Sequence, residues 1–368
     1  MISNISDIEN YLDDKSFKKI FLLTGTKSFE FSGAKKILSK ILKKKETKYF
    51  HKKSTLPVFE ELIKIIKEIR FFKPDLILAV GGGSVIDYAK ISNVVELKNN
   101  LKFLIKSYSY PYKKKFSKLA VIPTTAGSGA EVTSNAVIYL EGKKYSFESE
   151  MLIPDNFFLI PEFVISASNK LKASAGFDAI AQAVESLLSK KSTRGSVMYA
   201  KKSLKISTKS FIPFLEKTNI KNSAEMLIAS NLAGKAINVS KTISPHAISY
   251  PFTSIYNLSH GHAVSLFFEN FIKFNFDNLN KSETSFNIKK RYDLIFKLFG
   301  IKNIFDFENK LSFLKKKANL EDDLIKLNIN INKNTESIIR GVNLLRLSNN
   351  PVRINKKNII DIINQKKP

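Results

Sequence analysis

The sequence contains no cysteine among its 368 residues. This absence excludes disulfide bonds and thiolate metal ligands, so any bound metal must use histidine, carboxylate or amide groups. It also fits a reducing compartment, and we expect a cytoplasmic protein. No apolar run approaches the roughly 18 residues that span a bilayer, so we expect no membrane segment. The first residues, MISNISDIENYLDD, are polar and acidic, unlike a signal peptide.

Histidine is also scarce, because the chain has only four. Three of them, His246, His260 and His262, lie within seventeen residues, and the fourth is His51. The fourteen-residue separation of His246 and His260 is not that of a pair on one turn of a helix. The cluster therefore indicates either a metal site or ordinary core and surface histidines, and other motifs must decide between them.

The formal net charge of +27 raises the question of nucleic-acid binding. Most of the excess is lysine, which is spread along the whole chain together with abundant isoleucine and asparagine. There is no zinc-finger spacing and no arginine-rich arm. We therefore expect no specific nucleic-acid partner, although the surface can help to steer a small anionic substrate.

The chain is long for one domain, and its pattern changes near residue 160. Before that point, buried-strand patterns at 18–25, 47–52, 75–83 and 118–129 alternate with helical patterns at 31–44, 56–72 and 84–95. Strands that alternate with helices indicate a parallel sheet with both faces covered. After it, helical patterns predominate, at 173–190, 195–217, 223–239, 288–300 and 332–348. We predict an α/β nucleotide-binding domain over 1–160 and an all-α domain over 161–368.

Two glycine-rich loops follow predicted strands in the first domain. In AVGGGSVIDYAK, Gly81, Gly82 and Gly83 stand between a strand and a helix, where a backbone can approach a pyrophosphate closely. Ser84 can cap that helix or bind a phosphate oxygen. The second loop, PTTAGSGAEVT at 123–133, is rich in small hydroxyl residues. The first loop is not the G-x-G-x-x-G fingerprint, but two loops at neighbouring strand ends favour one nucleotide lying across both.

The second domain offers further candidate metal ligands. In GFDAIAQAVES, Asp178 and Gln182 are four residues apart, so they share one face of the predicted helix. Together with His246 and His260 they supply a carboxylate, an amide oxygen and two imidazoles, a set that suits Fe²⁺ or Zn²⁺. Taken singly, Asp178 also fits a solvated or capping aspartate, and Gln182 fits an exposed helix glutamine.

These motifs, in this order, resemble the iron-containing alcohol dehydrogenase family. The residues that carry the resemblance are GGGSVIDYAK, PTTAGSGAEVT, GFDAIAQAVES, PHAISYPFTSIYNLSHGHAV and the late NNPVRINKKNIIDII at 349–363. The resemblance covers nearly the whole chain. It implies the dehydroquinate synthase-like fold, with a nucleotide-binding α/β domain, a helical metal-binding domain and a cleft between them. It also implies NAD(P)-dependent oxidation of an alcohol or reduction of an aldehyde.

The resemblance places the family's metal ligands on Asp178, His246 and His260. At two positions the chain departs from the usual pattern. Gln182 stands where the family has a ligand histidine, and its carbonyl oxygen is a weaker ligand than imidazole. Tyr250 stands at another active-site histidine, and its phenolic O–H can donate a proton. We interpret His262, two residues after a ligand, as a supporting or structural residue.

The expected cofactor is NADP(H) or NAD(H). Its expected contacts are Gly25, Lys27, Gly81, Gly82, Gly83, Ser84, Asp87, Thr124, Thr125, Ser128, Thr133 and Lys144. The family often has an acidic residue at the end of the first strand, where it binds the ribose 2′-OH of NAD. Here that place holds Gly25, with Lys27 nearby, and this favours NADP(H).

The motifs DAIAQAVES, GKAINVSKTISPHAISYPFTSIY, HGHAV and TGTKSFEFSGA most resemble the phosphonoacetaldehyde reductase (hydroxyethylphosphonate dehydrogenase) branch. That branch reduces 2-phosphonoacetaldehyde to 2-hydroxyethylphosphonate. A phosphonate dianion needs cationic partners, for which Lys235, Lys241 and Arg194 are candidates. The alternatives are an iron-type dehydrogenase of another small alcohol or sugar acid, and a metal-less homologue without activity. A homodimer is among the expected assemblies.

Overall fold

The computed structural model describes residues 2–365, which form two compact units. The first unit holds the chain up to Ala167 together with Asn219–Ile228, and the second holds Ser168–Thr218 and the chain from Ala229 onward. The first turns of helix α10 (Ile220–Ser240) group with the first unit. The predicted domains 1–160 and 161–368 also include residues 1 and 366–368, which lie outside the described part.

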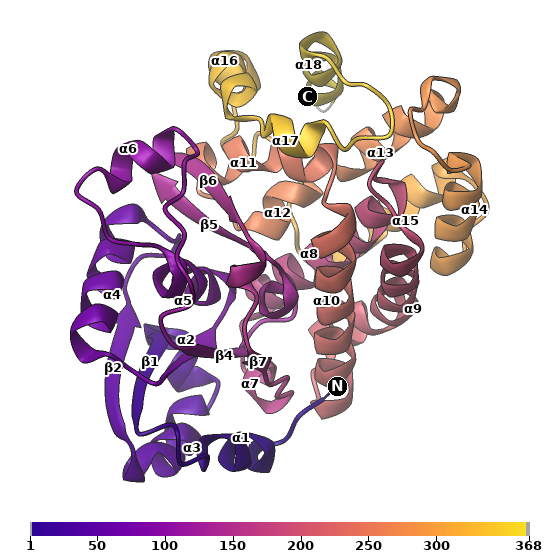
Figure 1. Cartoon of the computed structure of the whole chain (residues 1–368). Coiled ribbons are helices and arrows are strands. Elements are labelled where there is room, and N and C mark those ends of the chain that lie inside the picture. The colour runs from indigo at the N-terminus through magenta and orange to yellow at the C-terminus, as the bar shows by residue number, and fades with distance from the viewer. Residues whose placement is uncertain (1, 366–368) are drawn as a thin grey trace. The chain divides into compact units, whose positions relative to one another are not determined.

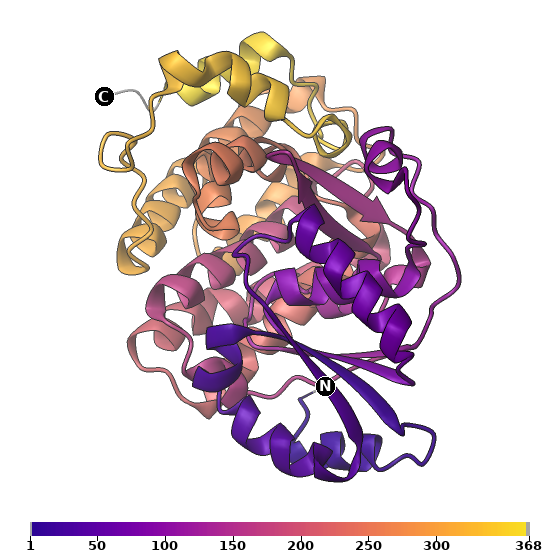
Figure 2. The ribbon, with the colours of Figure 1, turned by 90° about the vertical axis from the view of Figure 1, so that its left-hand side faces the viewer.

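The first unit is built on a sheet of five parallel strands, as the alternating pattern predicts (Figure 2). In spatial order they are β2 (Glu46–Lys52), β1 (Lys19–Gly25), β3 (Leu76–Gly81), β4 (Lys118–Pro123) and β7 (Asn156–Phe157). Strand β3 is buried along its whole length. Such continuous burial is typical of a parallel strand that has helices on both faces.

Alternate side chains of the strands enter two separate cores. Phe21 and Leu23 pack with α4 (Phe59–Phe72) and α5 (Gly83–Val94), whereas Ile20 and Leu22 face the opposite side. That side is covered by α1 (Ile5–Leu12), α2 (Thr26–Phe31), α3 (Ala34–Ile41) and α7 (Glu162–Ile165) (Figure 1). The short helix α6 (Leu101–Lys106) adds Leu101 and Ile105 to the α4 and α5 side.

A hairpin of β5 (Asn135–Leu140) and β6 (Lys143–Glu148) also packs on the α4 and α5 side of the first unit. Its two-residue turn, Glu141 and Gly142, has positive φ at both positions, 51° and 73°. These are the angles of a type I′ turn, whose twist matches that of the paired strands. The strand pattern at 135–148 was not predicted from the sequence, and the hairpin is an addition to the expected fold.

The order of the strands brings three loops to one edge of the sheet. Strand β1 pairs with β2 on one side and with β3 on the other. The order in which successive strands are added to the sheet therefore changes direction at β1. Thr24 is in register with Val80, and Gly81 with Pro123, so β1, β3 and β4 end side by side. Open parallel sheets bind ligands outside the carboxyl ends of their strands at such a switch point.

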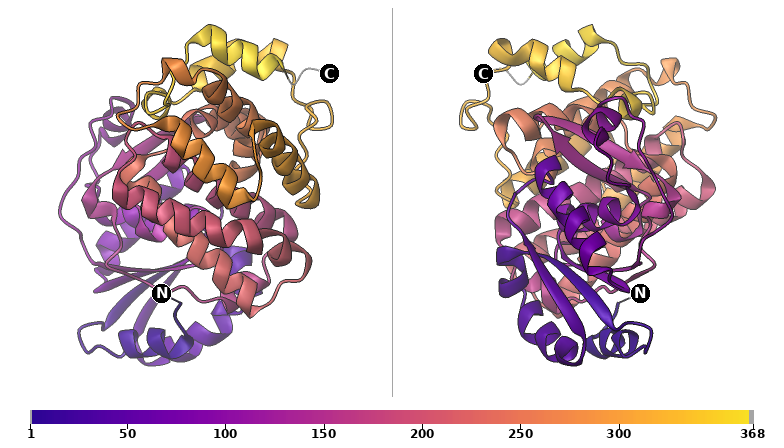
Figure 3. Two further views of the ribbon diagram at one scale, coloured as in Figure 1. Left: turned by 90° about the vertical axis from the view of Figure 1, so that its right-hand side faces the viewer. Right: turned by 60° about the vertical axis from the view of Figure 1, so that its left-hand side comes forward.

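The second unit consists of helices, as predicted (Figure 3). They are α8 (Asn169–Leu188), α9 (Arg194–Glu216), the later turns of α10, α11 (Ser244–Tyr256), α12 (His260–Ser265), α13 (Phe268–Asp277), α14 (Ile288–Phe299), α15 (Ile304–Lys317), α16 (Ile331–Gly341), α17 (Leu344–Leu347) and α18 (Lys356–Asn364). The single helical pattern at 332–348 corresponds to two helices, because Asn343 caps a new one.

Helix α8 is deeply buried, since nearly every residue from Lys172 to Leu188 is buried. No helix among residues 2–365 combines the length and the apolar character that crossing a membrane requires.

Candidate functional site

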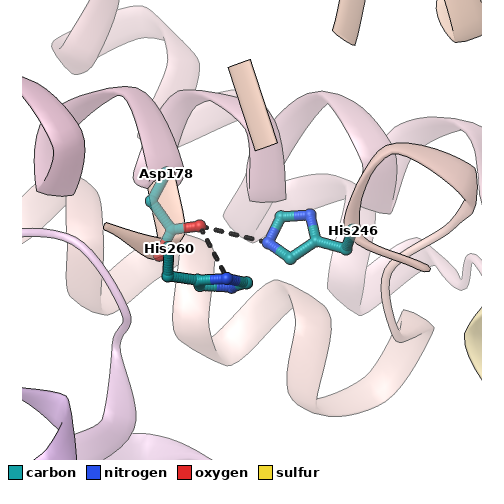
Figure 4. Close-up of side chains that lie close together, drawn as sticks. All are labelled: Asp178, His246 and His260. Atoms are coloured by element: carbon teal, nitrogen blue, oxygen red, sulfur yellow. Dashed lines mark hydrogen bonds and ion pairs between the residues drawn. The ribbon is translucent and has the colours of Figure 1, made fainter. Parts of the chain in front are cut away.

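Three helices of the second unit bring Asp178, His246 and His260 together, from α8, α11 and α12 (Figure 4). Each can offer one ligand atom, and these atoms all lie within 4.8 Å of one another. Asp178 Oδ1 is 3.1 Å from His246 Nε2 and 4.0 Å from His260 Nε2. Asp178 and His246 are buried, whereas the His260 side chain is 35% exposed, so the cluster is open on the His260 side.

Gln182 lies one turn beyond Asp178 on α8 and is also buried. Its Nε2 donates a hydrogen bond to Asp178 Oδ2 at 3.0 Å. Rotation of the amide would present the carbonyl oxygen at the same place. The position therefore suits either a fourth, oxygen ligand or a donor that orients Asp178.

Tyr250 follows His246 by one turn of α11 and is 8% exposed. The centre of its ring lies 6.2 Å from that of His260. The α11 helix thus carries a candidate ligand and a candidate proton donor on the same face.

Sequence reasoning missed Glu185, the partner of His246. Glu185 is fully buried, and its Oε1 lies 2.5 Å from His246 Nδ1. Burial opposes protonation of His246, but the carboxylates of Glu185 and Asp178 outweigh it and raise the pKa of the imidazole to about 10. The i, i+4, i+7 spacing of Asp178, Gln182 and Glu185 in the sequence places Glu185 on the same helix face, but it does not identify His246 as its partner.

His262 points elsewhere, as a supporting role requires. Its Nε2 donates to the backbone carbonyl of Glu321 at 2.6 Å, and its backbone N–H donates to Ser174 Oγ at 3.2 Å. Both bonds attach α12 to its surroundings within the second unit.

Gly261, between the two histidines of HGH, allows α12 to approach α8. A Cβ atom added there would lie 1.9 Å from the carbonyl oxygen of Ser174 and 3.0 Å from Asp178 Cβ. No side chain fits in that space. The close approach that Gly261 permits is what places His260 beside Asp178.

In the first unit, the two glycine-rich loops lie in contact at the carboxyl edge of the sheet. A Cβ atom on Gly81 would lie 2.5 Å from Val85, and one on Gly83 would lie 3.1 Å from Ser128 Oγ in the second loop. Thr124 Oγ1 is buried and has no hydrogen-bond partner among the described residues. A backbone cradle that a Cβ would fill and an unsatisfied hydroxyl both fit a bound nucleotide.

The remaining loop residues lie around this cradle. Gly82 is the N-cap of α5 and has no side chain that could cap the helix, so the first N–H groups of the helix, next to Ser84, receive no side-chain cap bond. A Cβ atom added to Gly82 would lie 3.4 Å from Thr125 Cγ2. Gly25 ends β1, and Lys27 is exposed on the first turn of α2.

Asp87 and Lys144 come together from α5 and β6. Burial raises the pKa of Asp87, while the charges of Lys90 and Lys144 oppose the rise. Lys90, which sequence reasoning missed, is fully buried, and its Nζ donates to Thr133 O, Thr133 Oγ1 and Asn135 O at 2.7–3.1 Å. Burial lowers the pKa of Lys90 despite the nearby Asp87. The lysine therefore fastens the end of the second loop to α5.

The three candidate phosphonate-binding cations have different surroundings. Lys241 follows α10 in the left-handed conformation, at φ 60°, and is partly buried. The ammonium of Lys235, also partly buried, lies 6.0 Å from the centre of the Tyr199 ring. Arg194 begins α9 and is exposed to solvent.

Two family models match the chain. One, described as iron-containing alcohol dehydrogenase, matches residues 3–161, and the other, described as the C-terminal part of the Fe-containing alcohol dehydrogenase family, matches residues 172–366. A 4-hydroxybutyrate dehydrogenase from Clostridium kluyveri is 32% identical over 222 residues, which are 59% of this chain and 59% of that enzyme. The match thus spans less than two thirds of the length of this curated relative.

Solved structures of similar proteins cover nearly the whole chain. An iron-containing alcohol dehydrogenase from Thermotoga maritima has a TM-score of 0.79 at 26% identity, with 98% of this chain and 95% of that chain covered. A sulfoacetaldehyde reductase from Bifidobacterium kashiwanohense, in complex with NAD⁺, has a TM-score of 0.86 at 24% identity over 99% and 95% of the two chains. The similarity to the sulfoacetaldehyde reductase shows a shared fold only.

Proposed function

This chain belongs to the iron-containing alcohol dehydrogenase family, and we propose that it reduces an aldehyde to a primary alcohol with NAD(P)H and a divalent metal. The observation that carries the proposal is the meeting of Asp178, His246 and His260, whose donor atoms lie within 4.8 Å. One carboxylate and two imidazoles suit Fe²⁺ or Zn²⁺, and Gln182 is the proposed fourth ligand. The test is cofactor oxidation with an aldehyde panel, before and after removal of metal.

Each part of the chemistry has a proposed group in the chain. A bound NAD(P)H would supply the hydride for the aldehyde carbon, and a divalent metal held by Asp178, Gln182, His246 and His260 would polarise the aldehyde oxygen. Tyr250 donates its phenolic proton to the oxygen, which completes the alcohol, and regains a proton from solvent. The glycine-rich loops hold the cofactor phosphates through backbone N–H groups, and Lys90 holds the second loop in place.

The proposed substrate is 2-phosphonoacetaldehyde, which is reduced to 2-hydroxyethylphosphonate. Support comes from the motif resemblance around KTISPHAISYPFT and from partly buried cations, Lys241 and Lys235, in the metal-binding unit. A specific observation also favours a second candidate, another small hydroxy acid, because a relative is named for 4-hydroxybutyrate. Both candidates carry an anionic group that a lysine can bind.

We expect kcat/KM for phosphonoacetaldehyde to exceed that for acetaldehyde or propionaldehyde by about 10²-fold or more, since two charge-assisted hydrogen bonds supply that difference. Lys241→Ala should raise KM for the phosphonate and leave neutral aldehydes nearly unchanged. Lys202→Ala, at an exposed position of α9, is the control. Equal efficiency on neutral and anionic aldehydes would remove the phosphonate assignment. A preference lost in moderate salt would assign the effect to surface steering instead.

We propose NADP(H) as the preferred cofactor, because Gly25 leaves room for a 2′-phosphate and Lys27 offers a positive charge. Gly25→Asp should shift the ratio of kcat/KM values toward NADH by repelling that phosphate. The new Cβ would lie 2.6 Å from Ser28 Oγ, a side-chain atom that can rotate away. Steady-state kinetics with both cofactors check the shift, and a strong preference of the wild type for NADH would contradict our interpretation of Gly25.

A further inference from the structure

We propose that Glu185 is a positioning residue of the metal site, whose carboxylate fixes the tautomer of His246 and anchors the start of α11. The inference rests on the proposed function, because it assumes that His246 binds a metal. Neither the motif spacing nor the ligand pattern assigns a role to Glu185.

The first contact determines which nitrogen of His246 keeps its proton when a metal binds. Glu185 Oε1 lies 2.5 Å from Nδ1, and Asp178 Oδ1 lies 3.1 Å from Nε2. An ionised carboxylate only accepts hydrogen bonds, so Nδ1 must be the donor toward Glu185. Before a metal binds, Nε2 faces Asp178 Oδ1 and is protonated as well; a bound metal would displace that proton from Nε2, the candidate ligand atom, while Nδ1 keeps the proton that it donates to Glu185.

The second contact fixes the helix that carries the ring. Glu185 Oε2 accepts a hydrogen bond from the backbone N–H of Ile243 at 2.7 Å, and Ile243 is the N-cap residue of α11. The same helix presents His246 and Tyr250. One carboxylate therefore determines both where α11 begins and how its histidine ring is rotated.

Asp178 and Glu185 lie two turns apart on one face of α8, and they contact opposite nitrogens of the His246 ring. Glu185 is fully buried, and a buried carboxylate is costly unless its oxygens are satisfied. Both of its oxygens have partners, and both partners belong to the segment that delivers His246. A helix anchor alone would need only one acceptor oxygen, so the second contact points to the ring.

The decisive variant is Glu185→Gln, which has nearly the same shape. A glutamine can accept from Ile243 N–H with its oxygen, but its NH₂ group must then donate to His246 Nδ1. That donation moves the ring proton to Nε2 and blocks the ligand atom. With the opposite rotation, the amide oxygen accepts from His246 Nδ1 and the tautomer is kept. The NH₂ group then faces Ile243 N–H, and two donors repel each other. Glutamine therefore satisfies one contact of Glu185 at most.

We expect Glu185→Gln to lower the affinity for Co²⁺ by about 10- to 100-fold and to alter the Co²⁺ absorption spectrum. Ser186→Ala is the matched control, because Ser186 is a fully buried neighbour on α8 that bonds Ser240 and not His246. It should lower the unfolding temperature without changing Co²⁺ affinity. Glu185→Asp, which keeps the acceptor charge, should recover part of the affinity and serves as the test variant if Glu185→Gln does not fold.

Wild-type Co²⁺ affinity and spectrum in a folded Glu185→Gln protein would overturn the proposal. So would an equal loss of affinity in Ser186→Ala, because the effect would then be one of α8 packing in general. Failure of the proposed function has a different signature, namely a wild-type protein that binds Co²⁺ but reduces no aldehyde.

Discussion

Replacing Asp178 by alanine is expected to abolish metal binding and aldehyde reduction while the protein keeps its fold and its cofactor affinity. Asp178 Oδ1 faces both imidazoles, at 3.1 and 4.0 Å. Loss of the ligand removes several kcal/mol of Lewis-acid stabilisation, which corresponds to a fall in kcat of about 10³-fold or more. Metal content, kcat and cofactor binding measured on the same sample check this result.

His260→Ala should give the same loss at a smaller cost in stability, because its side chain is 35% exposed whereas Asp178 is buried. Comparing Asp178→Ala with His260→Ala therefore separates the effect of losing a metal ligand from the effect of disturbing the packing of α8. Asp277→Ala, at a surface position paired with Lys273, is the control and should retain wild-type kinetics. Wild-type kcat in either ligand variant would rule out the proposed metal site.

Gly261→Ala is expected to be the most damaging single-methyl substitution near the site. The added Cβ would lie 1.9 Å from the Ser174 carbonyl oxygen and 2.8 Å from its carbon, both of which belong to the backbone of α8. Backbone atoms in a buried helix cannot move aside cheaply, and overpacking of this kind costs about 1–3 kcal/mol. Because α12 must shift away, His260 should separate from Asp178 and metal affinity should fall. Denaturant unfolding and Co²⁺ titration measure the two effects.

Gly195→Ala provides the matched control for Gly261→Ala. The nearest atom to a Cβ at Gly195 is Thr193 Oγ1 at 3.8 Å, an ordinary van der Waals distance. Alanine in the first turn of α9 should therefore leave stability and Co²⁺ affinity nearly unchanged. If Gly261→Ala behaves like this control, α12 does not depend on close contact with α8.

Hydrophobic periodicity was sufficient to predict the parallel sheet and the helical second unit. The apolar run at 18–25 indicates a strand buried on both faces, and the helical spacing at 56–72 indicates a helix buried on one face. Burial is what determines both elements. The hairpin β5–β6 was not predicted, because its turn, Glu141 and Gly142, lacks the Asn-Gly or Asp-Gly sequence that is typical of hairpins. The helical pattern at 31–44 corresponds to the shorter helix α3, because Gly33, at φ 78°, separates it from the end of α2.

The candidate ligands could be named from motifs because their residue types and spacing carry the chemistry. The geometry around them could not, since it depends on contacts between residues far apart in the chain. Glu185 is recognisable as a partner of His246 only when α8 and α11 lie together. The requirement for glycine at 261 likewise follows from the position of Ser174 on another helix.

The most direct test of the central claim is a metal-removal and reconstitution assay that follows the near-ultraviolet absorbance of NADH and NADPH. Wild-type protein is stripped of metal, supplied with phosphonoacetaldehyde and a panel of neutral aldehydes, and then given Fe²⁺ or Zn²⁺. We predict no turnover in the stripped sample and recovery on addition of one of the metals, with the phosphonate the best substrate. Full activity without metal, or no turnover with either metal and either cofactor, would contradict the account.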